Sequence, residues 1–181
     1  MAAVETAPLY RPVTPGGKPM SVEMTNLGPL GWVTDQAGYR YQPAHPVTGR
    51  PWPPIPQALL DLWADLAEAP GPPDACLVNL YREGARMGLH QDRDEADYRF
   101  AVLSISLGDT AVFRLGGTRR ADPTRSFRLS SGDVCRLAGP GRLAFHGVDR
   151  VLAGSSRLIP GGGRLNLTLR RAAPFTNLNE M

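Results

Sequence analysis

Polar and hydrophobic residues alternate strictly near the end of the chain, in residues 164–170 (RLNLTLR). A period of two is typical of a β-strand, and here it places two arginines, an asparagine and a threonine on one face and three leucines on the other. A strand at the surface would show the same alternation with its polar face in water. If that face points inward instead, the two guanidiniums need anions, because an unpaired buried charge is very costly. The planar arginine fork suits a carboxylate at each end of a small diacid.

Short hydrophobic segments separated by glycine-containing turns fill the region after residue 74. The candidate strands are Cys76–Tyr81, Phe100–Leu107, Ala111–Leu115, Ser126–Leu129, Asp133–Leu137, Leu143–Phe145 and Arg164–Arg171. Strands this short and numerous indicate an antiparallel sandwich or jelly roll. The chain shows neither an internal repeat nor the alternation of strands and helices that a Rossmann-type sheet requires.

One helix is predicted ahead of this region. Hydrophobic residues recur at helical spacing from Leu59 to Leu66 and prolines flank the run, so we expect a helix over residues 57–68. The residues before it are rich in proline and glycine, which indicates loops and short ribbons with few clear strands. These changes divide the chain into an N-terminal segment (1–56), a supporting helix and linker (57–73), a β-rich core (74–173) and a tail (174–181).

Composition favours one soluble domain. Of the 181 residues 42% are hydrophobic and 20% charged, with 20 glycines and 18 prolines, which fits a turn-rich globular domain and argues against a coiled coil, a collagen or a disordered chain. No hydrophobic run approaches the roughly 20 residues of a membrane span, and the N-terminus lacks the pattern of a secretory signal. Cys76 and Cys135 are expected to be buried thiols in a reducing compartment, so the expected location is the cytoplasm.

Charge is distributed unevenly, although the formal net charge is only +3. Residues 90–97 contain four acids and one arginine, whereas residues 114–128 contain five arginines and one acid. An acidic patch and a basic loop in one small domain fit a cation site beside an anionic partner. Charge alone favours ordinary solvated surface for both segments.

Histidine positions narrow the choice of cation site. His90 and Asp92 lie two residues apart in HQD, on one side of an extended segment and with Cα atoms about 6.5–7 Å apart, which lets both side chains reach one metal ion. His146 reaches the same ion only if the fold brings it back. Two histidines and one carboxylate form the facial triad of non-haem Fe(II) oxygenases, which leaves positions open for O₂ and a co-substrate. The HQD triplet alone is a weak signal, and the ordered set of HxD, a distant histidine and RxNxxxR is a stronger one.

With this ordered set, the chain resembles the AlkB-type Fe(II)/2-oxoglutarate-dependent nucleic-acid dealkylases from about Val13 to Ala172. The matching segments, in order, are 24–28 (MTNLG), 30–32 (LGW), 38–41 (GYRY), 51–53 (PWP), 79–81 (NxY), 90–95 (HQDRDE), 104–108 (SISLG), 120–123 (RxDP), 145–147 (FHG) and 164–170 (RLNLTLR). So many segments in one order make the resemblance highly specific.

The resemblance implies a mainly β (α+β) fold, with a double-stranded β-helix (jelly roll) core, one flanking helix and an N-terminal nucleotide-recognition lid. His90, Asp92 and His146 would bind Fe(II). The co-substrate 2-oxoglutarate would be held by Asn79, Tyr81, Arg164, Asn166 and Arg170, with Arg164 on its distal carboxylate. The flipped nucleotide would contact Trp32, Tyr39, Arg40, Tyr41, Asp94 and Arg120. The residues themselves also allow a core aromatic at Trp32, a sheet-face pair at Tyr39 and Tyr41, a turn cap at Asp94 and an ordinary surface Arg120.

The implied activity is oxidative demethylation of N-alkylated DNA bases such as 1-methyladenine and 3-methylcytosine. This direct reversal of DNA damage consumes O₂ and 2-oxoglutarate and releases formaldehyde, succinate and CO₂. The expected partner of a monomeric enzyme is alkylated DNA, with single strands favoured because the base must leave the stack. The alternatives are the same chemistry on RNA or tRNA, a non-catalytic jelly roll that binds nucleic acid, and oxygenation of a small molecule. Family members usually carry a longer segment ahead of the position of Pro12, with a strand and a helix that pack on the core. Either the start of this chain is mis-assigned or the protein does without that element.

Overall fold

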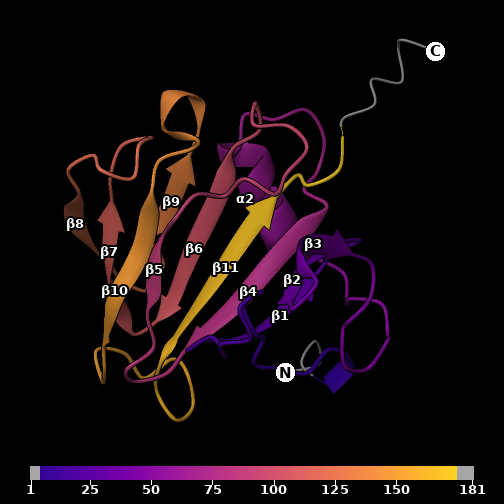
Figure 1. Ribbon diagram of the computed structural model, residues 1–181, viewed down its shortest axis with the longest axis horizontal. Coiled ribbons are helices and arrows are strands. Elements are labelled where there is room, and N and C mark those ends of the chain that lie inside the picture. The colour runs from indigo at the N-terminus through magenta and orange to yellow at the C-terminus, as the bar shows by residue number, and fades with distance from the viewer. Residues whose placement is uncertain (1–4, 175–181) are drawn as a thin grey trace.

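Eleven strands and one main helix make up the part of the chain that the computed structural model describes, residues 5–174 (Figure 1). The strands are β1 (Glu23–Leu27), β2 (Gly31–Asp35), β3 (Gly38–Gln42), β4 (Ala75–Tyr81), β5 (Met87–His90), β6 (Val102–Gly108), β7 (Thr110–Leu115), β8 (Arg125–Leu129), β9 (Val134–Leu137), β10 (His146–Leu152) and β11 (Arg164–Arg170). Five of them form a larger antiparallel sheet in the order β1-β4-β11-β6-β9, and four form a smaller one in the order β5-β10-β7-β8. The two sheets make a double-stranded β-helix, which confirms the predicted fold. The ribbon β2-β3 is a separate hairpin beside β1 and β4.

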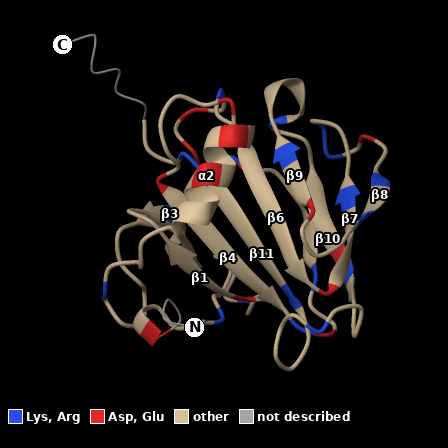
Figure 2. Ribbon diagram, turned by 180° about the vertical axis from the view of Figure 1, so that it is seen from behind, with Lys and Arg blue, Asp and Glu red and all other residues tan. Residues whose placement is uncertain are grey.

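Helix α2 (Gln57–Leu66) covers the outer face of the larger sheet (Figure 2). It begins after Pro56, and its Trp63 is buried in a hydrophobic cluster with Val78, Leu103 and Leu169 from three neighbouring strands. Full burial of a large hydrophobic side chain contributes about 1.5–3 kcal/mol, so this cluster holds the helix on the sheet. The predicted helix is confirmed, two residues shorter than expected.

Strand β11 lies in the middle of the larger sheet, between β4 and β6. Its three leucines face the cluster under α2, and its polar residues face the interior between the two sheets, where each of them is only 1–8% exposed. The inward orientation settles the alternative that the sequence left open for this strand. Two arginines are therefore buried at opposite ends of one strand, on one face.

One predicted strand, Leu143–Phe145, is wrong. Gly139–Gly141 form a short 3-10 helix that Arg142 continues as a turn, and β10 begins only at His146. The sequence did not predict β10 because a bulge between Val148 and Arg150 interrupts the alternation of this strand. Gly147 lies so close to β5 that an added Cβ would be 2.5 Å from the Met87 carbonyl oxygen. The other six predicted strands are confirmed to within two residues.

The N-terminal segment contains more regular structure than its composition indicated. Strand β1 pairs with β4 and forms an edge of the larger sheet, so part of residues 1–56 belongs to the core. Met24 and Leu27 are buried in two different clusters, and a strand that is buried on both faces shows no alternation. The predicted tail, 174–181, lies outside the described residues except for Pro174.

Neither cysteine forms a disulfide. Cys76 is buried under α2, and burial raises the pKa of its thiol to about 12. Cys135 is only half-buried and lines the central cavity, so the expectation of two buried thiols is confirmed for Cys76 and wrong for Cys135. Between residues 5 and 174, no helix combines the length and the hydrophobicity needed to cross a bilayer.

Candidate active site

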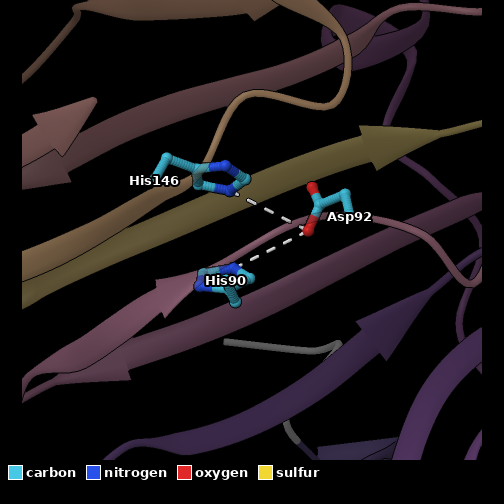
Figure 3. A group of neighbouring side chains, drawn as sticks. All are labelled: His90, Asp92 and His146. Carbon is cyan, nitrogen blue, oxygen red and sulfur yellow. Dashed lines mark ion pairs between the residues drawn. The ribbon is translucent and has the colours of Figure 1, made fainter. Parts of the chain in front are cut away.

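The fold brings three predicted metal ligands together at one end of the smaller sheet (Figure 3). His90 ends β5 and His146 begins β10, and the two residues are direct partners in the antiparallel pairing of these strands. Asp92 follows His90 in the next loop. The Nε2 atoms of His90 and His146 lie 3.7 Å and 3.9 Å from the same carboxylate oxygen, Oδ1 of Asp92. Possible ligand atoms of the three residues all lie within 4.8 Å of one another.

Both imidazoles are held in the orientation that a metal site requires. The Nδ1 atoms of His90 and His146 lie 2.9 Å from the backbone carbonyl oxygens of Gly88 and Ala144. Because a carbonyl oxygen only accepts, each Nδ1 carries the proton and donates it, which leaves the Nε2 lone pair directed at Asp92. Burial lowers the pKa of His146, which favours the neutral, ligating form.

Asp92 uses its two oxygens differently. Oδ1 faces the histidines, while Oδ2 accepts a hydrogen bond of 2.9 Å from Nη2 of Arg170. Burial by itself would raise the pKa of Asp92, but the positive charge of Arg170 is the largest opposing effect, and this pKa lies well below its usual range. An ionised carboxylate beside two neutral imidazoles is the donor set that non-haem Fe(II) prefers, so these residues fit the metal.

Arg164 lies at the other end of β11 and is 1% exposed. Its Nη2 donates to the Ser106 hydroxyl at 2.8 Å, and its guanidinium carbon lies 5.3 Å from the centre of the Tyr81 ring. Nε and Nη1 are buried without a hydrogen-bond partner among the described residues. Burial lowers the pKa of Arg164. A buried cation with two unused donors fits an anionic ligand such as the distal carboxylate of 2-oxoglutarate.

The remaining predicted co-substrate residues differ in how far the protein already satisfies them. Tyr81 is buried beside Arg164, and burial raises its pKa to about 12. The side-chain oxygen of Asn79 is buried without a hydrogen-bond partner in the described part of the chain. Asn166, by contrast, donates to Ser104 and Ile105 and accepts from Thr168. Arg164 therefore has the clearest unused capacity for an anionic ligand, whereas the unpaired oxygen of Asn79 is an acceptor and cannot bind a carboxylate. The predicted roles of Asn79, Tyr81, Asn166 and Arg170 stay predictions.

A cavity of about 380 Å³ joins the metal donors to Arg164 and to part of the predicted nucleotide lid. Nε1 of Trp32 donates to Oδ2 of Asp94 at 2.6 Å. The half-exposed ring of Tyr39 stacks on Trp32, with ring centres 5.5 Å apart and an 18° angle between the planes. Trp32, Tyr39 and Asp94 all line the cavity. An aromatic surface and a carboxylate thus lie beside the metal donors.

The other three predicted nucleotide contacts do not line this cavity. Arg40 is paired with Asp35 through contacts of 2.7 Å and 3.0 Å. The Tyr41 hydroxyl donates to a buried carboxylate, that of Glu95, at 2.6 Å. Arg120 donates to the Leu89 carbonyl oxygen, and its guanidinium lies over the Phe145 ring. Arg40, Tyr41 and Arg120 already have partners within the protein, and their contact with a nucleotide stays a prediction.

Two residues that the sequence analysis did not select belong to this site. Glu95 and Arg142 form an ion pair of 2.9 Å with side chains only 2% and 3% exposed. Arg142 follows the Gly-Pro-Gly turn, in the segment that was predicted as strand. An arginine beside a turn is normally at the surface, so no local signal marked it; the acid at position 95 stood next to the predicted Asp94.

Comparison with known proteins agrees with this geometry. The model of the 2OG-Fe(II) oxygenase superfamily matches residues 1–170. The alpha-ketoglutarate-dependent dioxygenase AlkB homolog of Caulobacter vibrioides (strain NA1000 / CB15N) is 72% identical over 172 residues, which cover 95% of this chain and 78% of that protein. The alpha-ketoglutarate-dependent dioxygenase AlkB of Escherichia coli (strain K12) is 46% identical over 170 residues, or 92% of this chain and 78% of that protein.

A solved structure supports the same relationship. The structure of OsALKBH1 superposes with a TM-score of 0.80 and 31% sequence identity, and the match covers 93% of this chain and 86% of that one. The family match, the relatives and the converging His-Asp-His donors agree on the cofactor, Fe(II), and on 2-oxoglutarate and O₂ as co-substrates. The chain therefore belongs to the 2OG-Fe(II) oxygenase superfamily and is an AlkB-type Fe(II)/2-oxoglutarate-dependent dioxygenase.

Proposed function

We propose that this dioxygenase removes N-methyl groups from alkylated bases of single-stranded DNA, with 1-methyladenine and 3-methylcytosine as its lesions. The observation that carries the proposal is the position of Trp32 and Asp94 beside the metal donors in one cavity. Trp32 and Tyr39 offer aromatic surface for stacking a base. Asp94 offers a carboxylate to the exocyclic amine and to the positive charge that methylation at these positions gives the base.

The protein's contribution to the reaction is to hold three partners in place. His90, Asp92 and His146 would hold Fe(II), which together with 2-oxoglutarate and O₂ supplies the oxidising power to hydroxylate the N-methyl carbon. Arg164 would orient 2-oxoglutarate through its two unused donors. Asn79 would contribute its side-chain NH₂ group, because 2-oxoglutarate offers only hydrogen-bond acceptors. The hydroxymethyl group then leaves the base nitrogen as formaldehyde, while 2-oxoglutarate ends as succinate and CO₂. The restored base has lost its positive charge and with it part of its attraction to Asp94.

Single-stranded DNA is favoured on energetic grounds. Taking a base out of a duplex costs a few kcal/mol, and a single strand avoids most of that cost. Stacking on an aromatic side chain contributes about 1–3 kcal/mol per base. Of the arginines between residues 114 and 128, Arg119 is paired with Asp122, whereas Arg125 and Arg128 are exposed on β8. Contact of such arginines with phosphates predicts binding that weakens with salt.

The test is demethylation of a single-stranded oligonucleotide that carries one 1-methyladenine. The reaction is measured by the release of formaldehyde and by the loss of mass of the oligonucleotide. The wild-type protein should need both Fe(II) and 2-oxoglutarate. His90→Ala and Asp92→Ala should abolish turnover, and Asp65→Ala on the exposed side of α2 should leave it unchanged. Turnover by either metal-site variant, or an inactive wild-type enzyme, would refute the proposal.

The remaining alternatives separate in the same assay. An RNA oligonucleotide of matched sequence compares DNA with RNA, and free 1-methyladenosine tests a small-molecule substrate. A non-catalytic binding module is no longer an alternative, because the chain belongs to a family of enzymes and carries the metal donors. We further expect a monomer in the reducing cytoplasm, since one chain holds the whole donor set and both cysteines are free.

A further inference from the structure

The loop that carries Asp92 and Asp94 is held in place by buried charged side chains. Arg142, from the turn before β10, donates from Nη1 to the Asp92 carbonyl oxygen at 2.8 Å, from Nε to the Phe100 carbonyl oxygen at 2.8 Å and from Nη2 to Glu95 at 2.9 Å. Its side chain is 3% exposed. One guanidinium thus fixes the backbone of a metal ligand and the loop that follows it.

Glu95 is the centre of this arrangement. Its Oε2 accepts from Arg142, while its Oε1 accepts from the Tyr41 hydroxyl at 2.6 Å and lies 3.3 Å from Nε of Arg170. Arg170 in turn pairs with Asp92 at 2.9 Å. The carboxylate of Glu95 therefore joins the two buried arginines that contact Asp92, one through its backbone and the other through its side chain.

The same loop is tied to the β2-β3 ribbon at two consecutive positions. Trp32 and Tyr41 are directly opposite each other in the ribbon. Trp32 donates to Asp94 and Tyr41 donates to Glu95. Two neighbours on the ribbon thus bind two neighbours on the metal-binding loop, so the aromatic surface and the metal donors have a fixed relative position.

We infer that Glu95 and Arg142 are a positioning pair. The pair fixes the backbone of Asp92 for metal binding and, through Tyr41, holds the β2-β3 ribbon so that Trp32 keeps a fixed position relative to the metal donors. Neither residue of the pair lies among the metal donors, and both act through Asp92. The part of this inference that concerns the ribbon rests on the proposed function, because it presumes a nucleic-acid substrate. The part that concerns the metal does not.

Charge and position make opposite predictions for Arg142. The two arginines, Arg142 and Arg170, balance the two carboxylates of Asp92 and Glu95 in the buried network. Removal of Arg142 leaves one extra buried negative charge, which by electrostatic attraction alone would strengthen the binding of a divalent cation. If Arg142 acts by position, its removal frees the Asp92 backbone and weakens binding instead. Loss of groups that orient metal ligands typically costs 10- to 100-fold in metal affinity.

The experiment is calorimetric titration of the metal-free full-length protein with Co(II), beside thermal unfolding of each variant without metal. Arg142→Met should raise the Co(II) Kd about 10- to 100-fold, and Arg142→Lys should recover part of the affinity, because an ammonium can reach fewer of the three acceptors. Arg136→Met is the matched control, since it breaks an exposed Arg–Glu pair, with Glu68, and should leave the Kd unchanged. An unchanged or lower Kd in Arg142→Met overturns the inference. Failure of both Arg142 variants to fold, with Arg136→Met folded, assigns Arg142 to folding and also overturns it.

Tyr41→Phe tests the link to the ribbon. It should leave the Co(II) Kd within twofold of wild type and raise the Kd for a methylated single-stranded oligonucleotide, measured by fluorescence anisotropy, about tenfold. Equal oligonucleotide binding by the variant and the wild type refutes the link. If the wild type binds no oligonucleotide at all, the proposed function fails, while the Co(II) titrations still decide the role of Glu95 and Arg142.

Discussion

The two arginines of β11 share a strand, a face and a buried position, but the protein treats them differently. Arg170 contacts two carboxylates, Asp92 at 2.9 Å and Glu95 at 3.3 Å. Burial would lower the pKa of Arg170, and its acidic neighbours outweigh burial and raise it. Arg164 forms no ion pair with any acid of residues 5–174, and burial lowers its pKa.

The difference separates a charge that the fold requires from a charge that a ligand requires. The Arg170 end is balanced internally, because Asp92 needs a fixed orientation before it can bind a metal. The Arg164 end keeps a buried cation with two unused donors, which is costly until an anion arrives. The alternation in the sequence indicated a carboxylate at each end of a diacid; in the structure the protein itself supplies the carboxylates at one end.

The largest expected effect comes from breaking the balanced end. Arg170→Met leaves Asp92 and Glu95 buried with too little positive charge, so the free energy of unfolding of the metal-free protein should fall by about 3–5 kcal/mol. Arg164→Met removes a buried charge that has no anion and should leave that free energy unchanged or higher. Chemical denaturation of both variants measures the contrast. Equal losses in the two variants would show that the comparison between the ends is wrong.

Breaking the other end should affect co-substrate use instead. Arg164→Met removes charge-assisted hydrogen bonds to the distal carboxylate that together contribute about 3 kcal/mol. The KM for 2-oxoglutarate should therefore rise about 100-fold, with Arg164→Lys in between because an ammonium keeps the charge without the planar fork. Steady-state kinetics with varied 2-oxoglutarate gives the result. A KM within twofold of wild type would remove Arg164 from the co-substrate site.

Ligand-induced stabilisation sharpens the comparison without any turnover. At 100 times its Kd, 2-oxoglutarate should stabilise the Co(II)-loaded wild-type protein by about 2.7 kcal/mol, which corresponds to a rise in Tm of about 5–10 °C for a domain of this size. Arg164→Met should show almost no rise at the same concentration. The control ligand 2-oxobutyrate lacks the distal carboxylate, so it should affect both proteins equally. A full 2-oxoglutarate effect in Arg164→Met would place the distal carboxylate elsewhere.

The regular parts of this protein were predictable because their signals are local. Alternation marked β11, and helical spacing marked α2. The family resemblance assigned His146 to the same metal site as His90 and Asp92, although His146 is far from them in the sequence. The position of Arg142 was not predictable in this way. Its three hydrogen bonds go to residues that precede it by 42 to 50 positions, and the segment around it has a turn where leucine and phenylalanine indicated a strand.

Strand β10 was not predicted from the sequence for a related reason. Its bulge and its close approach to β5 at Gly147 are properties of a pair of strands, and the pattern along one strand does not contain them. The nucleotide lid was predicted as one group of contacts, whereas the structure divides it into residues that line the cavity, such as Trp32, and residues that are engaged elsewhere, such as Arg40. Hydrogen-bond partners made this division, and they depend on the complete fold.

The smallest expected effect concerns the turn before Arg164, which Asp109 holds. The backbone N–H groups of Gly163 and Ser156 donate to this buried carboxylate at 2.9 Å and 2.8 Å. Burial would raise the pKa of Asp109, but these N–H groups outweigh it and lower the pKa.

Because the folded-state pKa of Asp109 is depressed, the stabilisation is complete above the unfolded pKa of about 3.9 and is lost as the pH falls through the folded-state pKa. Asp109→Asn should therefore cost about 1 kcal/mol at pH 7 and make the unfolding free energy less dependent on pH below about 4, whereas Asp65→Asn should change neither. If the variant also raises the Kd for 2-oxoglutarate, the unbalanced end of β11 depends on this turn to aim Arg164; an unchanged pH profile would instead show that the carboxylate of Asp109 does not hold the turn.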